Sequence, residues 1–340
     1  MADNSISIAT THDLTNEQWE AKLYKTYQEG TFFGKFKGVG QGSIVQVKRQ
    51  LEKVPGDAIT FGLAGTIRGT AGVTGNTPLE GYNGSAYVVN NQEITFNDQR
   101  VVIDQIRQSV KISGKLDEKR VAFNLREEAK SKLTDWMAYN EDQAIFAVLA
   151  TADEVGGASS SVAGSFSGAS DDILTYDKIV DMKKEAMFPT TNNVTGGAAT
   201  TRKIEPIRLS GGEEVFVLGV NPSDAAAFRK SDDFKNFNQN AGIRGMDNAV
   251  FTGALGVFNN VIIHEHSSFT AGKPVLMGAN AVFLAYGKEI MYGEKMFDYD
   301  NQTGFMIGSI RGVALAKFTD PDSGSTTGVG SHGAIVFDIA

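Results

Sequence analysis

The alternation of apolar and polar residues along the chain predicts helices and strands that are mixed without a regular rhythm. At 58–63 the apolar side chains Ile59, Phe61 and Leu63 recur at every second position, as on one face of a strand. Further strand-like segments lie at 43–54, 85–98, 100–112, 214–220, 256–269, 273–286, 304–318 and 333–339. Because no strand–helix–strand unit repeats, the pattern predicts an α+β fold.

Helical periodicity predicts three internal helices, one of them unusually long. It runs from Asp117 to residue 150 and, at about 1.5 Å per residue, would span roughly 50 Å, more than a compact domain needs. Its predicted stripe passes through Val121, Leu125, Ala129, Leu133, Trp136, Asn140 and Ala144. The second helix begins at Thr175 and stops before Pro189, and the third begins at Ser223, whose hydroxyl can cap the first turn.

Residues 15–29 predict an amphipathic helix that stands apart from the core. Thr15 precedes a glutamine by three residues, which is a capping-box pattern. Trp19, Leu23 and Tyr27 recur at every fourth position and form one apolar stripe on a polar helix. A Gly-rich connector follows, so we interpret this helix as an arm that lies on another surface.

The stretch GTIRGTAGVTGNTPLEGYNG at 65–84 lies between strand-like segments and predicts the far end of a long hairpin. A loop of about twenty residues with no secondary structure of its own is usually functional. It does not fit a phosphate-binding loop, because residues 76–78 are Asn-Thr-Pro rather than lysine followed by serine or threonine, and a strand comes next. The sequence has no lysine between Lys53 and Lys111.

Composition and charge narrow the range of functions. The 340 residues include 32 Lys and Arg against 40 Asp and Glu, and the formal net charge of −8 disfavours sequence-specific recognition of nucleic acid. The chain has no cysteine, which removes disulfides, thiolate ligands and cysteine nucleophiles. No window approaches about 18 apolar residues and the N-terminus lacks a signal-peptide pattern, so we expect no membrane partner.

Candidate catalytic and metal-binding residues are few. His264 and His266 are two positions apart and would share one side of a strand, as two metal ligands could. We interpret them as polar residues where a strand leaves the core, and a metal-dependent hydrolase stays as the alternative. The acidic segments 298–300 and 320–322 predict turns, because neither has the acidic residue that closes an EF-hand calcium loop. We therefore predict no enzyme activity, no cofactor and no metal.

The predicted elements suit an assembly of many copies better than a monomer. An N-terminal arm, a long β-hairpin and a rod-like helix would each leave an apolar stripe or an unpaired strand edge in water. Neighbouring copies would cover these surfaces, and repeated heterologous contacts about a rotation axis close into rings.

Several strings in the chain resemble one known family. They are IVQVKRQLEKVPGDAITFGLAG at 44–65, GNTPLEG at 75–81, ITFNDQRVVIDQIRQ at 94–108, LGVNPSDAAAFRK at 218–230 and GALGVFNNVIIHEH at 253–266. In this order they resemble the major capsid proteins of tailed phages, which have the Hong Kong 97 coat fold, and most closely those of N4-like phages. The resemblance covers essentially the whole chain.

The resemblance implies a division of the chain into five regions. These are an N-terminal arm at 1–44, an extended-loop region at 45–100, a peripheral domain with a spine helix at 101–189, an axial domain at 190–289 and peripheral return strands at 290–340. It also implies intersubunit contacts through the loop tip and the arm. The residues concerned are Gly69, Gly72, Gly75, Pro78, Leu79 and Glu80 of the tip, and Trp19, Leu23 and Tyr27 of the arm.

The resemblance further implies pentamers and hexamers that form an icosahedral shell around double-stranded DNA, with assembly in the cytoplasm of a bacterial host and a final place in the virion. A separate scaffolding protein, a portal protein and possible decoration proteins are the implied partners, and DNA would be held without sequence specificity. Because the loop contains no lysine, we expect no isopeptide crosslink from it. An encapsulin-like shell with an enzyme cargo is the alternative within the same fold.

Overall fold

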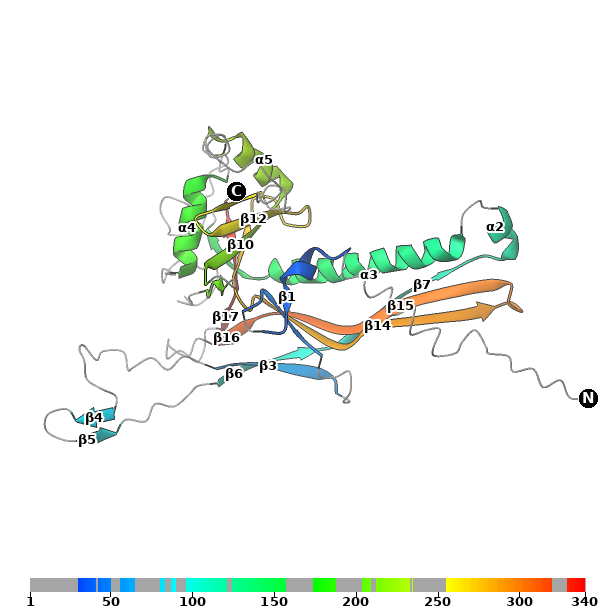
Figure 1. Cartoon of the computed structure of the whole chain (residues 1–340), viewed down its shortest axis with the longest axis horizontal. Coiled ribbons are helices and arrows are strands. Elements are labelled where there is room, and N and C mark those ends of the chain that lie inside the picture. Colours follow the sequence, from blue (N-terminus) through cyan, green and yellow to red (C-terminus); the bar gives the residue numbers. More distant parts are fainter. Residues whose placement is uncertain are drawn as a thin grey trace, which may run out of the picture.

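The structure is a computed structural model of the whole chain, in which a long hairpin and one long helix extend away from a second sheet (Figure 1). It describes residues 30–40, 42–49, 56–64, 80–82, 87–89, 96–120, 124–156, 174–187, 204–208, 212–232, 234, 255–319 and 329–339.

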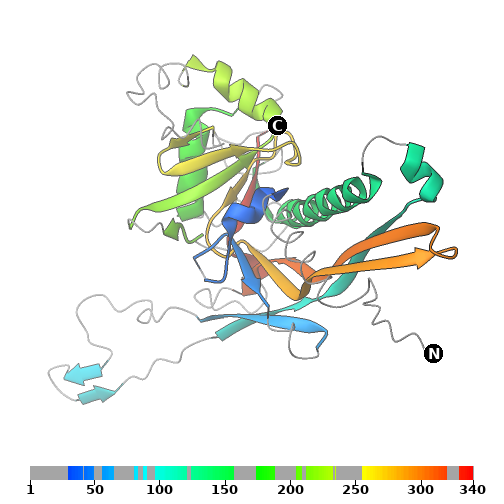
Figure 2. The same ribbon diagram turned by 45° about the vertical axis from the view of Figure 1, so that its right-hand side comes forward.

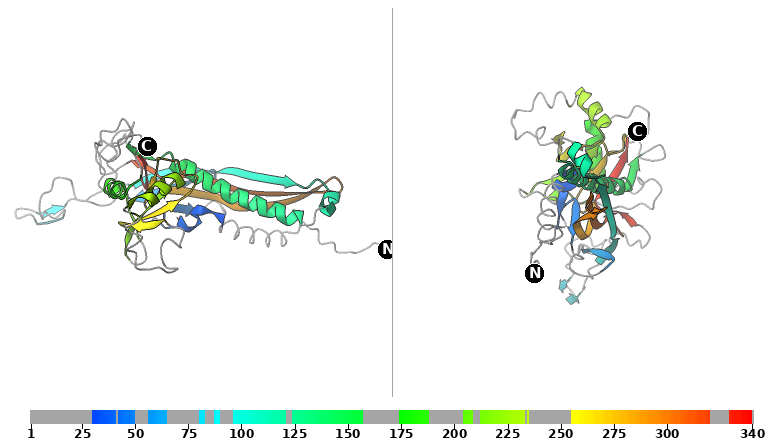
Figure 3. Two further views of the ribbon diagram at one scale, coloured as in Figure 1. Left: turned by 90° about the horizontal axis from the view of Figure 1, so that it is seen from above. Right: turned by 90° about the vertical axis from the view of Figure 1, so that its right-hand side faces the viewer.

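The first sheet has five strands in the order β1-β2-β14-β15-β7 and is built around a long hairpin. The hairpin consists of β14 (Val282–Phe297) and β15 (Gln302–Leu315). The other strands are β1 (Lys37–Gly38), β2 (Val45–Lys48) and β7 (Asp104–Lys111). Helix α3 (Leu125–Leu149) runs along this hairpin (Figure 3), and Leu133, Met137 and Phe305 are buried between them.

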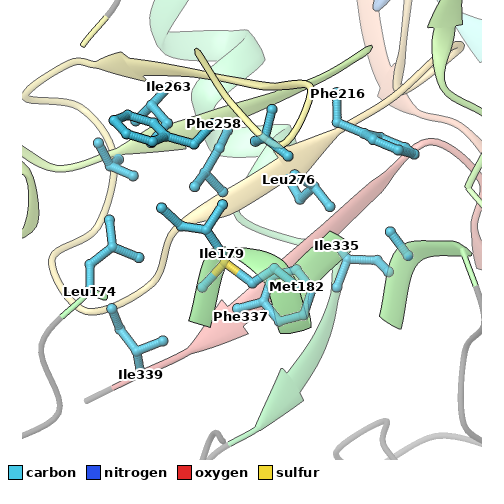
Figure 4. Close-up of a cluster of buried hydrophobic side chains, with 14 of the residues drawn as sticks. Leu174, Ile179, Met182, Phe216, Phe258, Ile263, Leu276, Ile335, Phe337 and Ile339 are labelled. Atoms are coloured by element: carbon cyan, nitrogen blue, oxygen red, sulfur yellow. The ribbon is translucent and has the colours of Figure 1, made fainter. Parts of the chain in front are cut away.

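The second sheet has seven strands, with β11-β12-β10-β13-β18-β8 in order and β9 paired to β10. Their bounds are β8 Asp153–Gly156, β9 Ile207–Arg208, β10 Glu214–Val220, β11 Gly256–Phe258, β12 Val261–Glu265, β13 Val275–Met277 and β18 Ala334–Asp338. Helices α4 (Tyr176–Met187) and α5 (Pro222–Lys230) pack against it. Figure 4 shows this core, which includes Ile179 and Met182 of α4 and Phe216 and Phe337 of the sheet.

Three two-stranded sheets complete the described structure. They are β3 (Ala58–Ala64) with β6 (Phe96–Val102), β4 (Glu80–Tyr82) with β5 (Tyr87–Val89), and β16 (Lys317–Thr319) with β17 (Val329–Ser331). A short 3₁₀ helix, η1 (Phe32–Phe36), precedes β1. Strands and helices are mixed without a repeating unit, and the predicted α+β class is confirmed.

The long predicted helix is wrong in one respect, because the structure divides it into two helices. Helix α2 (Lys115–Arg120) ends before Asn124, and α3 begins at Leu125. Asn124 has an extended backbone, and its side chain accepts a hydrogen bond from the Arg126 N–H, so it caps α3. The short polar side chain of asparagine competes with helix continuation, which explains the interruption.

The predicted cap of α5 is also wrong by two residues. Asn221, not Ser223, is the N-cap, and its Oδ1 accepts from the Ser223 N–H at 3.0 Å while Pro222 takes the first helical position. The Asn221 side chain also donates to the Phe269 carbonyl at 2.6 Å, so one residue fixes both the helix and the loop after β12.

We expect Asn221→Ala to lower the free energy of unfolding by about 1–2 kcal/mol, because it removes a cap and a second hydrogen bond. Chemical denaturation of the purified subunit measures the change. Ser223→Ala is the matched control and should cost less, because the Ser223 backbone N–H keeps its partner. An equal or larger loss in the control would contradict the assignment of the cap.

The two sheets take strands from several of the regions that the resemblance implied. Strand β8 and helix α4 lie within 101–189, yet they join the seven-stranded sheet and its core. Strand β14 crosses the boundary between 289 and 290, and β18, from the last region, pairs with β13 and β8. Sequence periodicity carries no information on such long-range pairing.

Candidate functional site: assembly surfaces

The predicted extended loop has its root in the strand pair β3–β6, which leaves the body beneath β14 (Figure 1). The register runs from Ala58 opposite Val102 to Ala64 opposite Phe96, so the two strands form a hairpin stem. The hairpin β4–β5 lies beyond the stem (Figure 2). Glu80 begins β4 and pairs with Val89. The other predicted tip residues, Gly69, Gly72, Gly75, Pro78 and Leu79, lie outside the described residues.

An aromatic stack holds the stem to the body. The Phe61 ring lies parallel to that of Phe283 on β14, with centroids 4.3 Å apart, and both are buried. The Lys48 ammonium sits 4.7 Å from the Phe61 centroid and donates to the Thr60 carbonyl at 2.9 Å. The amide of Gln99 bridges the start of β16 by accepting from the Lys317 N–H and donating to the Leu315 carbonyl.

The N-terminal segment enters the described structure at Gly30, whereas Trp19, Leu23 and Tyr27 lie outside it. Residues 31–38 pack between α3 and the end of β12. Phe33 is fully buried 4.8 Å from the Phe146 ring, and Phe32 lies 4.8 Å from the His266 ring. Apolar contacts of this kind attach the root of the segment to its own subunit.

The two histidines of the alternative hydrolase reading belong to this aromatic cluster. His266 stacks on Phe146 at 4.7 Å, and its Nδ1 accepts from the Ser268 N–H at 3.2 Å. Burial lowers the pKa of His266, which favours the neutral ring. His264 is buried beside Phe36, with Lys35 Nζ 3.4 Å from its Nδ1. Among the residues that the structure describes, no group of three metal-ligating side chains occurs.

A buried charged centre lies where α3 crosses the long hairpin. Glu141 on α3 is 0% exposed and Arg311 on β15 is 2% exposed. Arg311 donates to Glu141 Oε2 at 3.1 Å and to Asn140 Oδ1 at 2.6 Å. The Tyr286 hydroxyl, from β14, donates to the same Glu141 oxygen at 2.8 Å. Helix and hairpin are therefore joined by charge-assisted hydrogen bonds as well as by apolar packing.

The N-terminal segment reaches the same centre from the other side. Lys37 forms an ion pair with Glu141 Oε1. The neighbouring Asp142 accepts from the Phe32 N–H at 2.6 Å and from the Phe33 N–H at 3.3 Å. Two adjacent carboxylates of α3 thus bind a side chain and two backbone groups of residues 31–38.

Burial changes the protonation of this centre. Desolvation raises the pKa of Glu141 from 4.5 to about 7, against the opposing effect of Arg311. Desolvation likewise lowers the pKa of Lys37 from 10.5 to about 8, although Asp142 opposes it. Burial also raises the pKa of Asp142, and the N–H groups of Phe32 and Phe33 oppose this shift.

The raised pKa of Glu141 predicts a pH dependence of stability. The folded state keeps the Glu141 proton longer than the unfolded state, so this group's contribution falls as the pH rises from 4.5 to about 7. The full change is about 3 kcal/mol. Urea denaturation of wild type and Glu141→Gln at pH 5 and pH 7.5 measures it, because the glutamine cannot titrate. Parallel profiles for the two proteins would contradict the raised pKa.

Sequence reasoning missed this centre. On α3 the buried positions Leu133, Met137, Glu141, Ile145 and Leu149 follow one another at every fourth residue. A carboxylate inside an otherwise apolar stripe was the available signal. Its partners Lys37 and Arg311 lie 104 and 170 residues away, so spacing could not identify them.

The turn between β14 and β15 lies at the far end of the long hairpin and is exposed. Asp298, Tyr299 and Asp300 have positive φ angles of 51°, 51° and 64°, and the predicted turn at 298–300 is confirmed. The Tyr299 side chain is fully exposed. A positive φ angle is uncommon for residues other than glycine, although aspartate adopts it more often than most. The other predicted turn, at 320–322, lies outside the described residues.

No described helix is both long and apolar enough to cross a membrane.

Comparisons with known proteins agree with this architecture. A family model described as phage capsid protein matches residues 7–155 and 152–274. The major capsid protein of Pseudomonas phage KPP25 is 24% identical, with 90% of this chain and 91% of that protein covered. The capsid of Ralstonia phage GP4 matches with a TM-score of 0.68 at 21% identity and covers 91% of this chain and 90% of that chain. The capsid of cyanophage Pam1 matches with a TM-score of 0.64 at 22% identity over the whole of both chains.

The family match spans well over half of the sequence, and the two similar capsid structures share the fold over at least 90% of each chain. A structural protein of this kind needs surfaces for neighbouring copies rather than a catalytic pocket. The chain belongs to the phage capsid protein family, and it is a structural major capsid protein with the Hong Kong 97-type coat fold.

Proposed function

We propose that this chain assembles as pentamers and hexamers into the icosahedral shell of a tailed-phage head that encloses double-stranded DNA. The observation that carries the proposal is the stem β3–β6, which leads away from the body to the hairpin β4–β5 (Figure 1). A two-stranded ribbon is marginally stable on its own in water. A neighbouring subunit supplies the surface that such a ribbon needs.

The separate parts of the chain take different roles in this shell. Residues 65–84 are the loop tip that lies over the adjacent subunit, with Gly69, Gly72, Gly75, Pro78, Leu79 and Glu80 at the contact. Glycine suits this place, because the same sequence must take slightly different backbone shapes in pentamers and hexamers. Trp19, Leu23 and Tyr27 form the contact stripe of the N-terminal arm. Helix α3 is the spine helix of the subunit.

The proposed partners follow from the same reading. A separate scaffolding protein guides assembly, a portal protein occupies one vertex, and decoration proteins are further candidates. The strings at 44–65 and 218–230 support placement near the coat proteins of N4-like phages. The loop makes no isopeptide crosslink, because no lysine lies between Lys53 and Lys111. The net charge of −8 supports an inner wall that holds DNA without sequence specificity.

Electron microscopy of the purified protein tests the proposal. The protein is expressed alone and then with a candidate scaffolding protein, at physiological salt. We expect closed shells, tubes or rings of capsomers in at least one condition. A matched variant, with residues 65–79 replaced by a short Gly-Ser linker, should keep its circular dichroism spectrum but lose closed shells. A uniform monomer or dimer of the wild type in both conditions would overturn the proposal.

Shells that contain an enzyme in place of DNA would instead support the encapsulin-like alternative. The match to a phage capsid family favours the phage reading. The packing of His264 and His266 among phenylalanine rings gives no support to a hydrolase.

A further inference from the structure

Glu141 bonds to two parts of the subunit, the long hairpin and the N-terminal segment, and the hairpin has the more extensive contacts. Its Oε2 is held by Arg311 and Tyr286, which belong to the long hairpin. Its Oε1 is held by Lys37, which belongs to the N-terminal segment. If the segment departed, Glu141 would keep a cation and a hydroxyl donor. Burying an ionised side chain is most costly when it is left without such partners.

Asp142 is committed to the segment instead. Both of its oxygens accept backbone N–H groups, from Phe32 and Phe33. Because both of these donors belong to the segment, its departure would let Asp142 exchange them for water, in which a carboxylate is well solvated. Departure would therefore leave neither carboxylate buried and uncompensated.

The remaining attachments of the segment are one short strand pair and an apolar cluster. Strand β1 is two residues long and pairs with β2 only through Lys37 opposite Val45 and Gly38 opposite Gln46. The rings of Phe32, Phe33 and Phe36 pack on Phe146 and the two histidines. Phe33 belongs to the buried cluster that also contains Val282 and Leu284 of β14, and this cluster is separate from the core under α4. By contrast, β14 and β15 pair along 13 residue positions. Their side chains contribute to two buried apolar clusters, one with Val282 and Leu284 and one with Ile290 and Phe305.

We propose that Lys37, Glu141, Asp142 and the N–H groups of Phe32 and Phe33 form a detachable lock, here named the arm lock, which holds the root of the N-terminal arm to its own subunit. The arm lock opens without unfolding the long hairpin, because Arg311 and Tyr286 continue to compensate Glu141. Glu141 is thus a positioning residue for the arm. The description of residues 1–44 as an intersubunit arm rests on the proposed function, whereas the lock itself does not.

Hydrogen–deuterium exchange of the full-length protein, read by mass spectrometry, tests the arm lock. Lys37→Met removes the cation but keeps the length of the side chain, and Asp142→Asn removes the charge of the second acceptor. In both we expect peptides covering 30–38 to exchange at least about tenfold faster, since hydrogen bonds and ion pairs with charged groups are the stronger class. Peptides from 302–311 should exchange at the wild-type rate.

Two further variants complete the test. Lys132→Met removes a lysine from the exposed side of the same helix and should leave both sets of peptides unchanged. Arg311→Met removes the compensating cation and should accelerate exchange in the hairpin as well as in the segment. Equal acceleration of both sets in Lys37→Met, or no acceleration of the 30–38 peptides in either lock variant, would overturn the proposal. Because the measurement needs no shells, its failure is distinct from a failure to assemble.

Discussion

Replacing Arg311 with methionine is expected to lower the free energy of unfolding by about 3 kcal/mol, because it leaves a fully buried carboxylate with one cation in place of two. Arg311 also orients Asn140, so the variant loses a second charge-assisted hydrogen bond. Urea denaturation at pH 7.5 measures the loss, because Glu141 is then mostly ionised.

A double variant distinguishes the loss of the ion pair from a loss of packing. Glu141→Gln combined with Arg311→Met removes both buried charges and should recover a large part of the stability, as apolar or neutral replacements of whole buried pairs often do. Additive losses in the two single variants and the double variant would contradict direct coupling between these side chains.

Replacing Phe61 with alanine is expected to cost about 3 kcal/mol and to prevent shell assembly. The ring is fully buried and stacked on Phe283, and it joins the extended-loop stem to the hairpin. Its loss should release β3 and β6 from β14 while the seven-stranded sheet stays folded. Limited proteolysis within 57–103 and electron microscopy of the products measure the two effects.

Phe228→Ala is the matched control for this variant. Phe228 is also fully buried, but it lies in the core of the seven-stranded sheet, 5.3 Å from the Phe258 ring. We expect a similar loss of stability without proteolysis of the stem. If both variants lose shells at temperatures where both remain folded, the specific role of the Phe61 stack is contradicted.

Local signals in the sequence predicted much of the secondary structure. The apolar run before Asn221 corresponds to β10, and the helix that starts after Thr175 ends at Met187, as predicted from the nearby proline. These elements follow from residues within one or two turns of each other. The exact caps did not. Asn124 lies inside one continuous helical pattern that begins at Asp117, and Asn221 lies two residues before Ser223, which is also able to cap a helix.

The site was less predictable, for a physical reason. The predicted stripe passes through Trp136 and Asn140, which are only half-buried, whereas the buried face of α3 includes Glu141 and Asp142. A carboxylate becomes tolerable in the interior only when partners from other elements surround it. Those partners are brought together by the fold, and a single sequence does not record which residues meet.

The place of β18 in its sheet has a consequence for how the subunit is made. Residues 334–338 lie between β13 and β8, inside the sheet rather than at its edge. Asp153 and Ser331, which are 178 residues apart, exchange two hydrogen bonds beside it. Strand β8 therefore cannot pair with β18 until the ribosome has translated about 180 further residues. A nascent chain completes this sheet only after β18 has been synthesised, which delays its entry into growing shells until then.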